Sequence, residues 1–137
     1  MKLIRHFASL AAVAAVMLLT LSACSGMSKR EKSMIGKYYI QTISDTHPLI
    51  ELNDKNQAVV RAIRPGELSY SVAGTWHVEE DSLIITTDPS SITIEEGDPS
   101  LVGSVAPRLA YPIIQYDEIT LRLQRQGAVY DYHRRPE

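Results

Sequence analysis

The sequence predicts an all-β domain, a small antiparallel up-and-down barrel or sandwich of about eight strands. From residue 34 onward, apolar and polar residues alternate with a period of two, as in strands with one buried face. Short alternating segments recur between turn residues, and no segment after Met34 has the spacing of an amphipathic helix. A closed barrel would also remove the exposed strand edges that promote aggregation.

The clearest alternation lies in residues 68–79. Leu68, Val72 and Trp76 fall on one face of this segment, and Ser69 and His77 fall on the other. We therefore expect a long strand with one buried face. Trp76 should lie in the core, with the small Gly74 leaving room for its ring.

Other segments repeat this pattern, and turn residues separate them. In chain order, we expect further strands at residues 37–43, 49–53, 58–63, 82–87, 92–95, 110–116, 118–124 and 128–134. In one of these segments Ile119, Leu121 and Leu123 share a face. Residues 64–67 and 125–127 are typical of turns, whereas residues 100–109 fit a loop or an irregular strand.

The first 24 residues have the layout of a secretory signal peptide. Lys2 and Arg5 give a positive start, residues 7–21 are apolar, and small residues precede Cys24. The apolar run is shorter than the roughly 20 residues of a membrane-spanning helix. An ordinary secretory signal, which would leave a free thiol, is the alternative.

Residues 21–24, Leu-Ser-Ala-Cys, resemble the lipobox of bacterial lipoproteins. The resemblance implies that residues 1–23 are a lipoprotein signal peptide and that Cys24 is the lipid attachment site, carrying fatty acyl chains such as palmitate. Residues 24–33 would then be a lipidated polar tether. Two or three acyl chains anchor a protein stably, whereas one chain binds a membrane only marginally. Ser25 favours the outer membrane, facing the periplasm, so we expect a cell-envelope location with the membrane as partner.

Motifs in residues 34–135 resemble, in their order, the lipocalin-like domains of small bacterial lipoproteins. The shared features are a glycine and an aromatic residue in the first strand, a glycine-tryptophan hairpin and a final strand ending in arginine. The matching residues are Gly36, Tyr38, Gly74, Trp76, Asp81, Leu83, Ile85 and Arg134. Tyr38 stands where tryptophan is usual. The resemblance implies a lipocalin-like β-barrel domain at residues 34–137.

Composition and motifs exclude several function classes. The net charge is −2, which offers no basic footprint for nucleic acid. Cys24 is the one cysteine, so the chain forms no internal disulfide. There is no G-x-S-x-G motif, no glycine-rich phosphate loop and no calcium-binding loop. We therefore expect no enzyme, no catalytic residues and no cofactor.

Histidines and tyrosines are the remaining candidate site residues. His47, His77 and His133 lack the spacing that brings two metal ligands together, so we expect solvated histidines and no metal site. Seven tyrosines stand against one phenylalanine. Their hydroxyls could line a cavity for a polar or sugar ligand, or tyrosine could simply suit strands. These tyrosines are Tyr38, Tyr39, Tyr70, Tyr111, Tyr116, Tyr130 and Tyr132.

Two function classes remain. The first is a membrane-anchored binding module for a small apolar or amphipathic ligand, which needs a hollow interior with small inward residues. Candidates for such positions are Ala58, Ala62, Ala73 and Gly74. The alternative is a structural or interaction lipoprotein that binds an envelope protein through its surface and has a filled barrel core. Exposed apolar residues for that surface could come from Val59, Ile63 and the 100–114 segment. Which residues bind a ligand stays unknown from the sequence.

Overall fold

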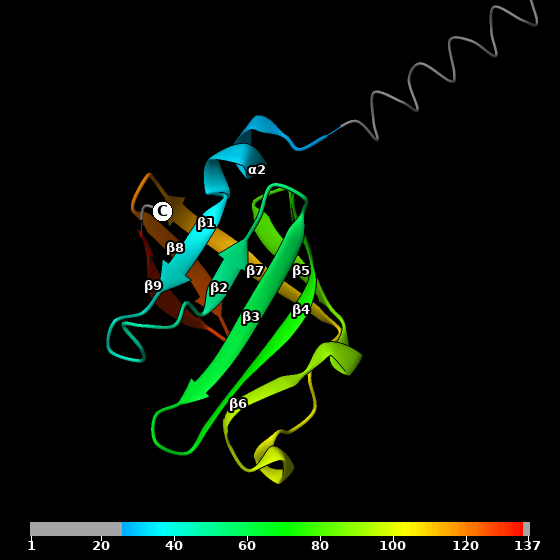
Figure 1. The fold of residues 1–137 in the computed structure, drawn as a ribbon. Helices are drawn as coiled ribbons and strands as arrows, with labels where there is room; N and C mark the ends of the chain where they lie inside the picture. Colours follow the sequence, from blue (N-terminus) through cyan, green and yellow to red (C-terminus); the bar gives the residue numbers. More distant parts are fainter. Residues whose placement is uncertain (1–25, 136–137) are drawn as a thin grey trace, which may run out of the picture.

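The computed structural model describes residues 26–135, which form a closed antiparallel β-barrel (Figure 1). The predicted signal peptide and Cys24 lie outside the described residues. Eight strands follow one another around the barrel in chain order, and β6 is an additional strand beside β4. The predicted all-β, up-and-down barrel is therefore confirmed. Its elements are α2 (Lys29–Met34), β1 (Gly36–Tyr39), β2 (Ile50–Leu52), β3 (Gln57–Arg64), β4 (Leu68–Glu79), β5 (Ser82–Thr87), η1 (Pro89–Ser91), β6 (Thr93–Gly97), η2 (Pro99–Leu101), β7 (Arg108–Tyr116), β8 (Thr120–Arg125) and β9 (Ala128–Arg135).

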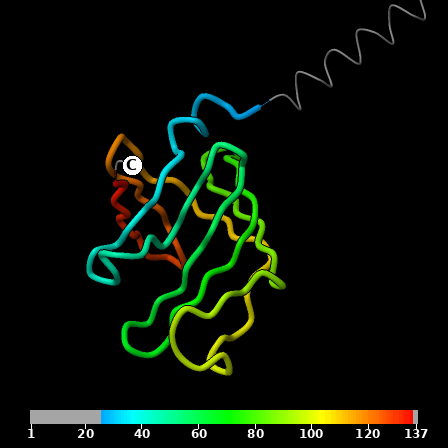
Figure 2. The backbone as a smooth tube through the Cα atoms, in the orientation of Figure 1, coloured from blue at the N-terminus to red at the C-terminus, as the bar shows by residue number. Residues whose placement is uncertain are grey.

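The pairing of β1 with β9 closes the barrel. Tyr38 lies opposite Ile50 of β2 on one side and Arg134 of β9 on the other. In Figure 2, the first and last strands run side by side although they are far apart in the sequence. Because alternate residues point into the barrel, this closure decides which side chains face the interior.

The alternation in β4 follows the prediction. Leu68, Val72 and Trp76 are buried, and Trp76 is only 1% exposed. Two other predicted segments differ from the structure. The first strand ends at Tyr39 rather than at residue 43, because residues 40–44 turn, and the backbone N–H groups of Ile43 and Ser44 both donate to the carbonyl of Ile40. Ile119 precedes β8 and is 64% exposed, so it does not share the buried face of that strand.

Gly74 marks the place where β4 changes its neighbour. Two strands pair with the same edge of β4. β6 pairs with its first part, and β5 pairs with the part from Gly74 onward. A Cβ atom at Gly74 would lie 2.1 Å from the backbone oxygen of Thr86. The expectation that this glycine makes room for the Trp76 ring was therefore wrong, since the room is occupied by the backbone of β5.

The segment predicted as a polar tether contains the helix α2, which covers one end of the barrel (Figure 1). Ser28 and Glu31 form a capping box at its start. The second oxygen of the Glu31 carboxylate accepts a hydrogen bond from the backbone N–H of Val78, at 2.8 Å. Burial alone would raise the pKa of Glu31, but its hydrogen bonds with Ser28 and Val78 outweigh burial and hold that pKa below its ordinary value. Residues 28–33 thus belong to the folded domain, and their polar character serves capping and docking rather than a free linker.

The hydrophobic core is complete within the described residues. Its buried residues extend from Met34 to Tyr132 and come from α2, from Leu49 in the loop before β2, and from seven of the eight barrel strands. We therefore expect residues 25–137 to fold without the signal peptide, with a far-ultraviolet circular dichroism spectrum of a strand protein. No helix in residues 26–135 is long and apolar enough to cross a membrane.

Replacing Gly74 with alanine should destabilise the barrel. The added Cβ would collide with the backbone of β5, which has no flexible end that can move aside. Overpacking of this kind costs about 1–3 kcal/mol or more, and urea unfolding of residues 25–137 measures it. Gly103→Ala is the control, because a Cβ at Gly103 meets nothing within 4 Å. Equal stability of the two variants would contradict the close approach of β4 and β5.

Candidate functional site

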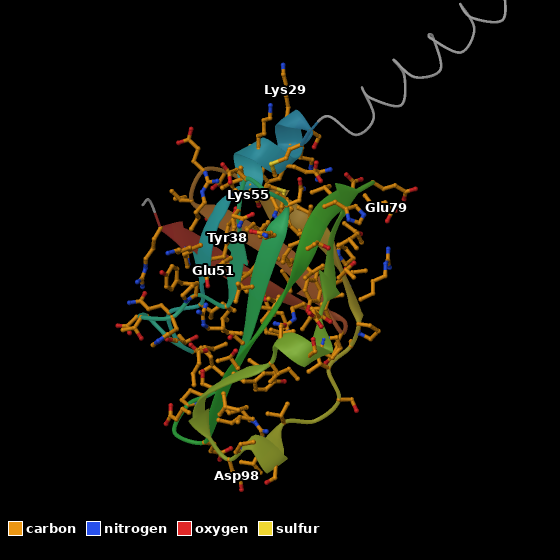
Figure 3. The ribbon with its side chains drawn as sticks, turned by 45° about the vertical axis from the view of Figure 1, so that its right-hand side comes forward. Lys29, Tyr38, Glu51, Lys55, Glu79 and Asp98 are labelled. Carbon is orange, nitrogen blue, oxygen red and sulfur yellow. The ribbon has the colours of Figure 1, made fainter. Side chains whose placement is uncertain are left out.

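The two ends of the barrel differ in how they are filled. At the end covered by α2, large side chains occupy the interior, including Trp76, Leu83 and Leu121 with Met34 of the helix. Tyr38 donates its hydroxyl hydrogen bond to the carbonyl of Met34 at 2.6 Å. Figure 3 shows Lys29 at this end of the molecule and Asp98 at the opposite end. The α2 end is therefore closed.

At the opposite end, the interior opens as a cavity of about 680 Å³. The strands β3 and β4 extend past the shorter strand β5 and form one wall of the cavity. That wall carries Val60, Ala62, Tyr70 and Val72. Further lining residues come from β5, β7, β8 and three connecting segments, and they include Ile43, Leu49, Thr87, Ser104, Val105, Ala106, Leu109, Tyr111, Arg125 and Gln126.

Arg125 is the charged side chain that enters this cavity from β8. It continues the inward face of Leu121 and Leu123, both of which are fully buried. Its Nη1 atom donates a hydrogen bond to the hydroxyl of Tyr132 at 3.0 Å. Its guanidinium carbon lies 5.2 Å from the ring centroid of Tyr111 and 5.2 Å from that of Tyr130. Both distances are within the range of cation–π attraction.

Burial and neighbouring groups shift the pKa values of Arg125, Tyr111 and Tyr132. Burial alone would lower the pKa of Arg125, but the hydroxyls of Tyr132 and Tyr111 outweigh burial and raise it above the ordinary value. Burial raises the pKa of Tyr132 and of Tyr111, although the nearby guanidinium opposes the shift. The guanidinium is therefore a permanent cation, and these two phenols stay neutral well above physiological pH.

The charged residues that line the cavity are four arginines, and no aspartate or glutamate is among its lining residues. Arg61 forms ion pairs with Glu51 and Glu95, and Arg108 pairs with Glu79 at 3.2 Å. Arg64 donates to the carbonyl of Leu101 at 3.3 Å. Within residues 26–135, neither Arg64 nor Arg125 forms an ion pair with a carboxylate. The cavity therefore carries a net positive charge in a protein with a negative net charge.

The tyrosines singled out in the sequence occupy different environments. Tyr70 and Tyr111 line the cavity, and Tyr130 and Tyr132 surround Arg125 together with Tyr111. Tyr38 lies in the closed end, whereas Tyr39 packs against the guanidinium of Arg135 with a centroid distance of 4.0 Å. Tyr116 lies near Arg30. Two of the seven tyrosines thus line the cavity, and two others contact Arg125.

The four small residues proposed for inward positions lie in different environments. Ala62 lines the cavity, Ala58 is buried in the core, and Ala73 is exposed on the outer face. Gly74 contacts the backbone of β5, as described above. The interior is thus neither wholly hollow nor wholly filled, since Trp76 fills the α2 end and Tyr70 borders the opening.

The three histidines do not form a metal site. His47, His77 and His133 are each exposed, and His77 lies 3.6 Å from the carboxylate of Glu79. In the part of the chain that the structure describes, no three His, Cys, Asp or Glu residues are grouped as metal ligands. The predicted lipid attachment site, Cys24, lies outside the described residues. A second hollow of about 360 Å³ lies on β1 to β4 and includes Lys37, Glu51 and Val59 in its lining.

Arg125 was not among the predicted site residues, because residues 125–127 are typical of a turn. The two turn residues are Gln126 and Gly127, which both have a positive φ, and Arg125 is the last residue of β8. The pattern that places Leu121 and Leu123 on the inner face also places the residue two positions later there. An arginine at the end of an apolar face was the signal that could have identified the site.

Comparison with known proteins gives one similar structure. No family model matches this sequence, and no curated protein matches it. A crystal structure of an uncharacterized protein from Bacteroides eggerthii DSM 20697 is similar over 74% of this chain and 98% of that chain. The two share 14% sequence identity with a TM-score of 0.48.

The stability of the domain should fall at alkaline pH because of Tyr132. Since burial raises the folded-state pKa of this phenol, its neutral form contributes stability in full below the unfolded pKa of about 10, and this contribution is lost as the pH rises through the folded value. The urea midpoint should therefore drop above about pH 10. Tyr132→Phe should show a shallower drop than the wild type, and identical pH profiles would contradict the assignment.

Proposed function

We propose that this protein is a membrane-anchored cell-envelope lipoprotein whose lipocalin-like barrel binds a small apolar or amphipathic ligand without catalysis. The observation that carries the proposal is the unequal filling of the barrel. Its α2 end is packed, and its other end holds a cavity of about 680 Å³. Cavities of about 300–1,000 Å³ are typical of sites for small molecules.

The lining of the cavity is suited to an amphipathic ligand. Apolar side chains such as Val60, Val72 and Leu109 form a wall that an apolar chain or ring can contact. Tyr111 and Arg125 add polar atoms at the same site. A mostly apolar surface with a few polar groups is the usual composition of a ligand pocket.

The alternative function, binding of an envelope protein through the outer surface, has a smaller observation behind it. Leu101 and Ile114 in the 100–114 segment are 48% and 50% exposed. Val59 and Ile63, which were candidates for the same surface, are only partly exposed. Single exposed apolar residues are common on monomeric proteins, so we favour the ligand-binding function.

A neutral fluorescent probe tests ligand binding. N-phenyl-1-naphthylamine, which is apolar and uncharged, should bind residues 25–137 and increase in fluorescence. Ala62→Trp places a large ring at the cavity wall and should weaken probe binding about tenfold or more, since roughly 1.4 kcal/mol of lost contact corresponds to a factor of ten.

Val129→Trp is the matched control for this experiment. Val129 is 53% exposed on β9 and is not part of the cavity lining, so this variant should bind the probe like the wild type. Equal effects of the two tryptophans, or the absence of any probe binding, would count against the cavity. Native mass spectrometry of residues 25–137 purified from the host then identifies the class of any bound molecule.

The lipid anchor has its own test. Cys24→Ala removes the thiol that the lipobox resemblance assigns to lipid attachment. The variant should stay soluble or retain its signal peptide, whereas the wild-type protein should fractionate with the outer membrane. Recovery of the variant in the membrane at its mature mass would refute the anchor.

A further inference from the structure

Arg125 differs from the other arginines near the cavity in having unused hydrogen-bond donors inside the barrel. A guanidinium carries five N–H donors. Among the described residues, Arg125 has one hydrogen-bond acceptor, the hydroxyl of Tyr132. The rings of Tyr111 and Tyr130 lie at cation–π distance from the guanidinium, and the Tyr111 hydroxyl interacts with it as well. The remaining donors are therefore available to a ligand in the cavity.

The electrostatics of the cavity favour one kind of ligand. Burying a cation is costly unless an opposite charge or a set of acceptors compensates it. Neutral tyrosines compensate Arg125 only in part, and no carboxylate lines the cavity. Arg64, which also lacks a carboxylate partner among the described residues, adds positive charge at the same opening. An anionic group in the cavity would complete this arrangement.

Apolar and cationic side chains share the lining of the cavity. Apolar residues come from β3, β4 and β7, and Arg125 projects from β8. Arg61 and Arg64 lie on β3, and Arg61 is neutralised by Glu51 and Glu95. An apolar lining beside the unpaired cation of Arg125 matches a ligand with an apolar body and one charged head. A guanidinium binds planar carboxylate and phosphate groups through paired hydrogen bonds, which sets these two head groups apart from neutral ones.

We propose that the cavity binds an amphiphile with a single anionic head group, a carboxylate or a phosphate, and that Arg125 holds this head group. The inference rests on the proposed function, because it assigns the class of ligand for the same cavity. It predicts that the charge of the head group, rather than the length of the apolar chain alone, determines affinity.

Four probes with one apolar chain test the inference by isothermal titration calorimetry on residues 25–137, below their micelle concentrations. They are dodecanoate, dodecyl phosphate, 1-dodecanol and dodecyltrimethylammonium. At least one of the two anions should bind about 10- to 100-fold more tightly than the alcohol, as expected for charge-assisted hydrogen bonds. The anion that binds more tightly identifies the head group as carboxylate or phosphate.

Arg125→Gln should remove this preference, so that the two anions bind the variant no more tightly than 1-dodecanol does. Arg122→Gln is the matched control, since Arg122 lies on the same strand, loses the same charge and pairs with Asp131 at 2.7 Å, and it is not part of the cavity lining. It should keep the wild-type preference. Circular dichroism verifies that both variants are folded, and the comparison of probes on the wild type does not depend on any variant.

The outcomes separate the inference from the function on which it rests. If 1-dodecanol binds as tightly as both anions, or if Arg122→Gln loses as much preference as Arg125→Gln, the role of Arg125 is overturned while ligand binding stands. Tightest binding of the cationic probe would overturn it as well. If none of the four probes and no neutral naphthylamine probe binds, the binding function itself fails.

Discussion

The seam between β1 and β9 is the constraint on which the rest of the structure depends, and Arg134 is the residue that secures it. Its backbone N–H donates to the carbonyl of Ile119 at 2.8 Å. Its guanidinium donates to the carbonyls of Ser33, Ile35 and Glu118. One side chain therefore joins the last strand, the end of α2 and the turn before β8. With the seam closed, the inward and outward faces of all eight strands are fixed, and so is the position of the cavity.

The charged residues of the barrel serve two different purposes. On the outer face, arginines are neutralised by nearby carboxylates, as in the pair of Arg122 with Asp131. Exposed pairs of this kind add little to stability. Arg125 lies among aromatic rings instead, where cation–π contacts and one hydroxyl replace part of its hydration. A positive potential therefore persists inside the barrel.

Most of the fold could be predicted from the sequence, and most of the site could not. Alternation identified β4 and the burial of Trp76, because a period of two is a local property of the chain. The helix α2 was missed because five of its six residues are polar, and the hydrogen bond from Val78 to Glu31 that holds it is a contact between distant parts of the chain. Arg125 was missed for a related reason. Its partners Tyr111 and Tyr132 lie on neighbouring strands, and only the register of β8 with β7 and β9 brings them together.

The chain enters the barrel at the end that α2 covers, and the cavity opens at the other end (Figure 1). A lipid on Cys24 would be separated from Ser28 by only three residues, so the bilayer would lie against the closed end. The open end of the barrel would then face the aqueous space. A ligand would then reach the cavity from the aqueous space. Binding a ligand from the bilayer that holds the anchor would require the whole domain to reorient.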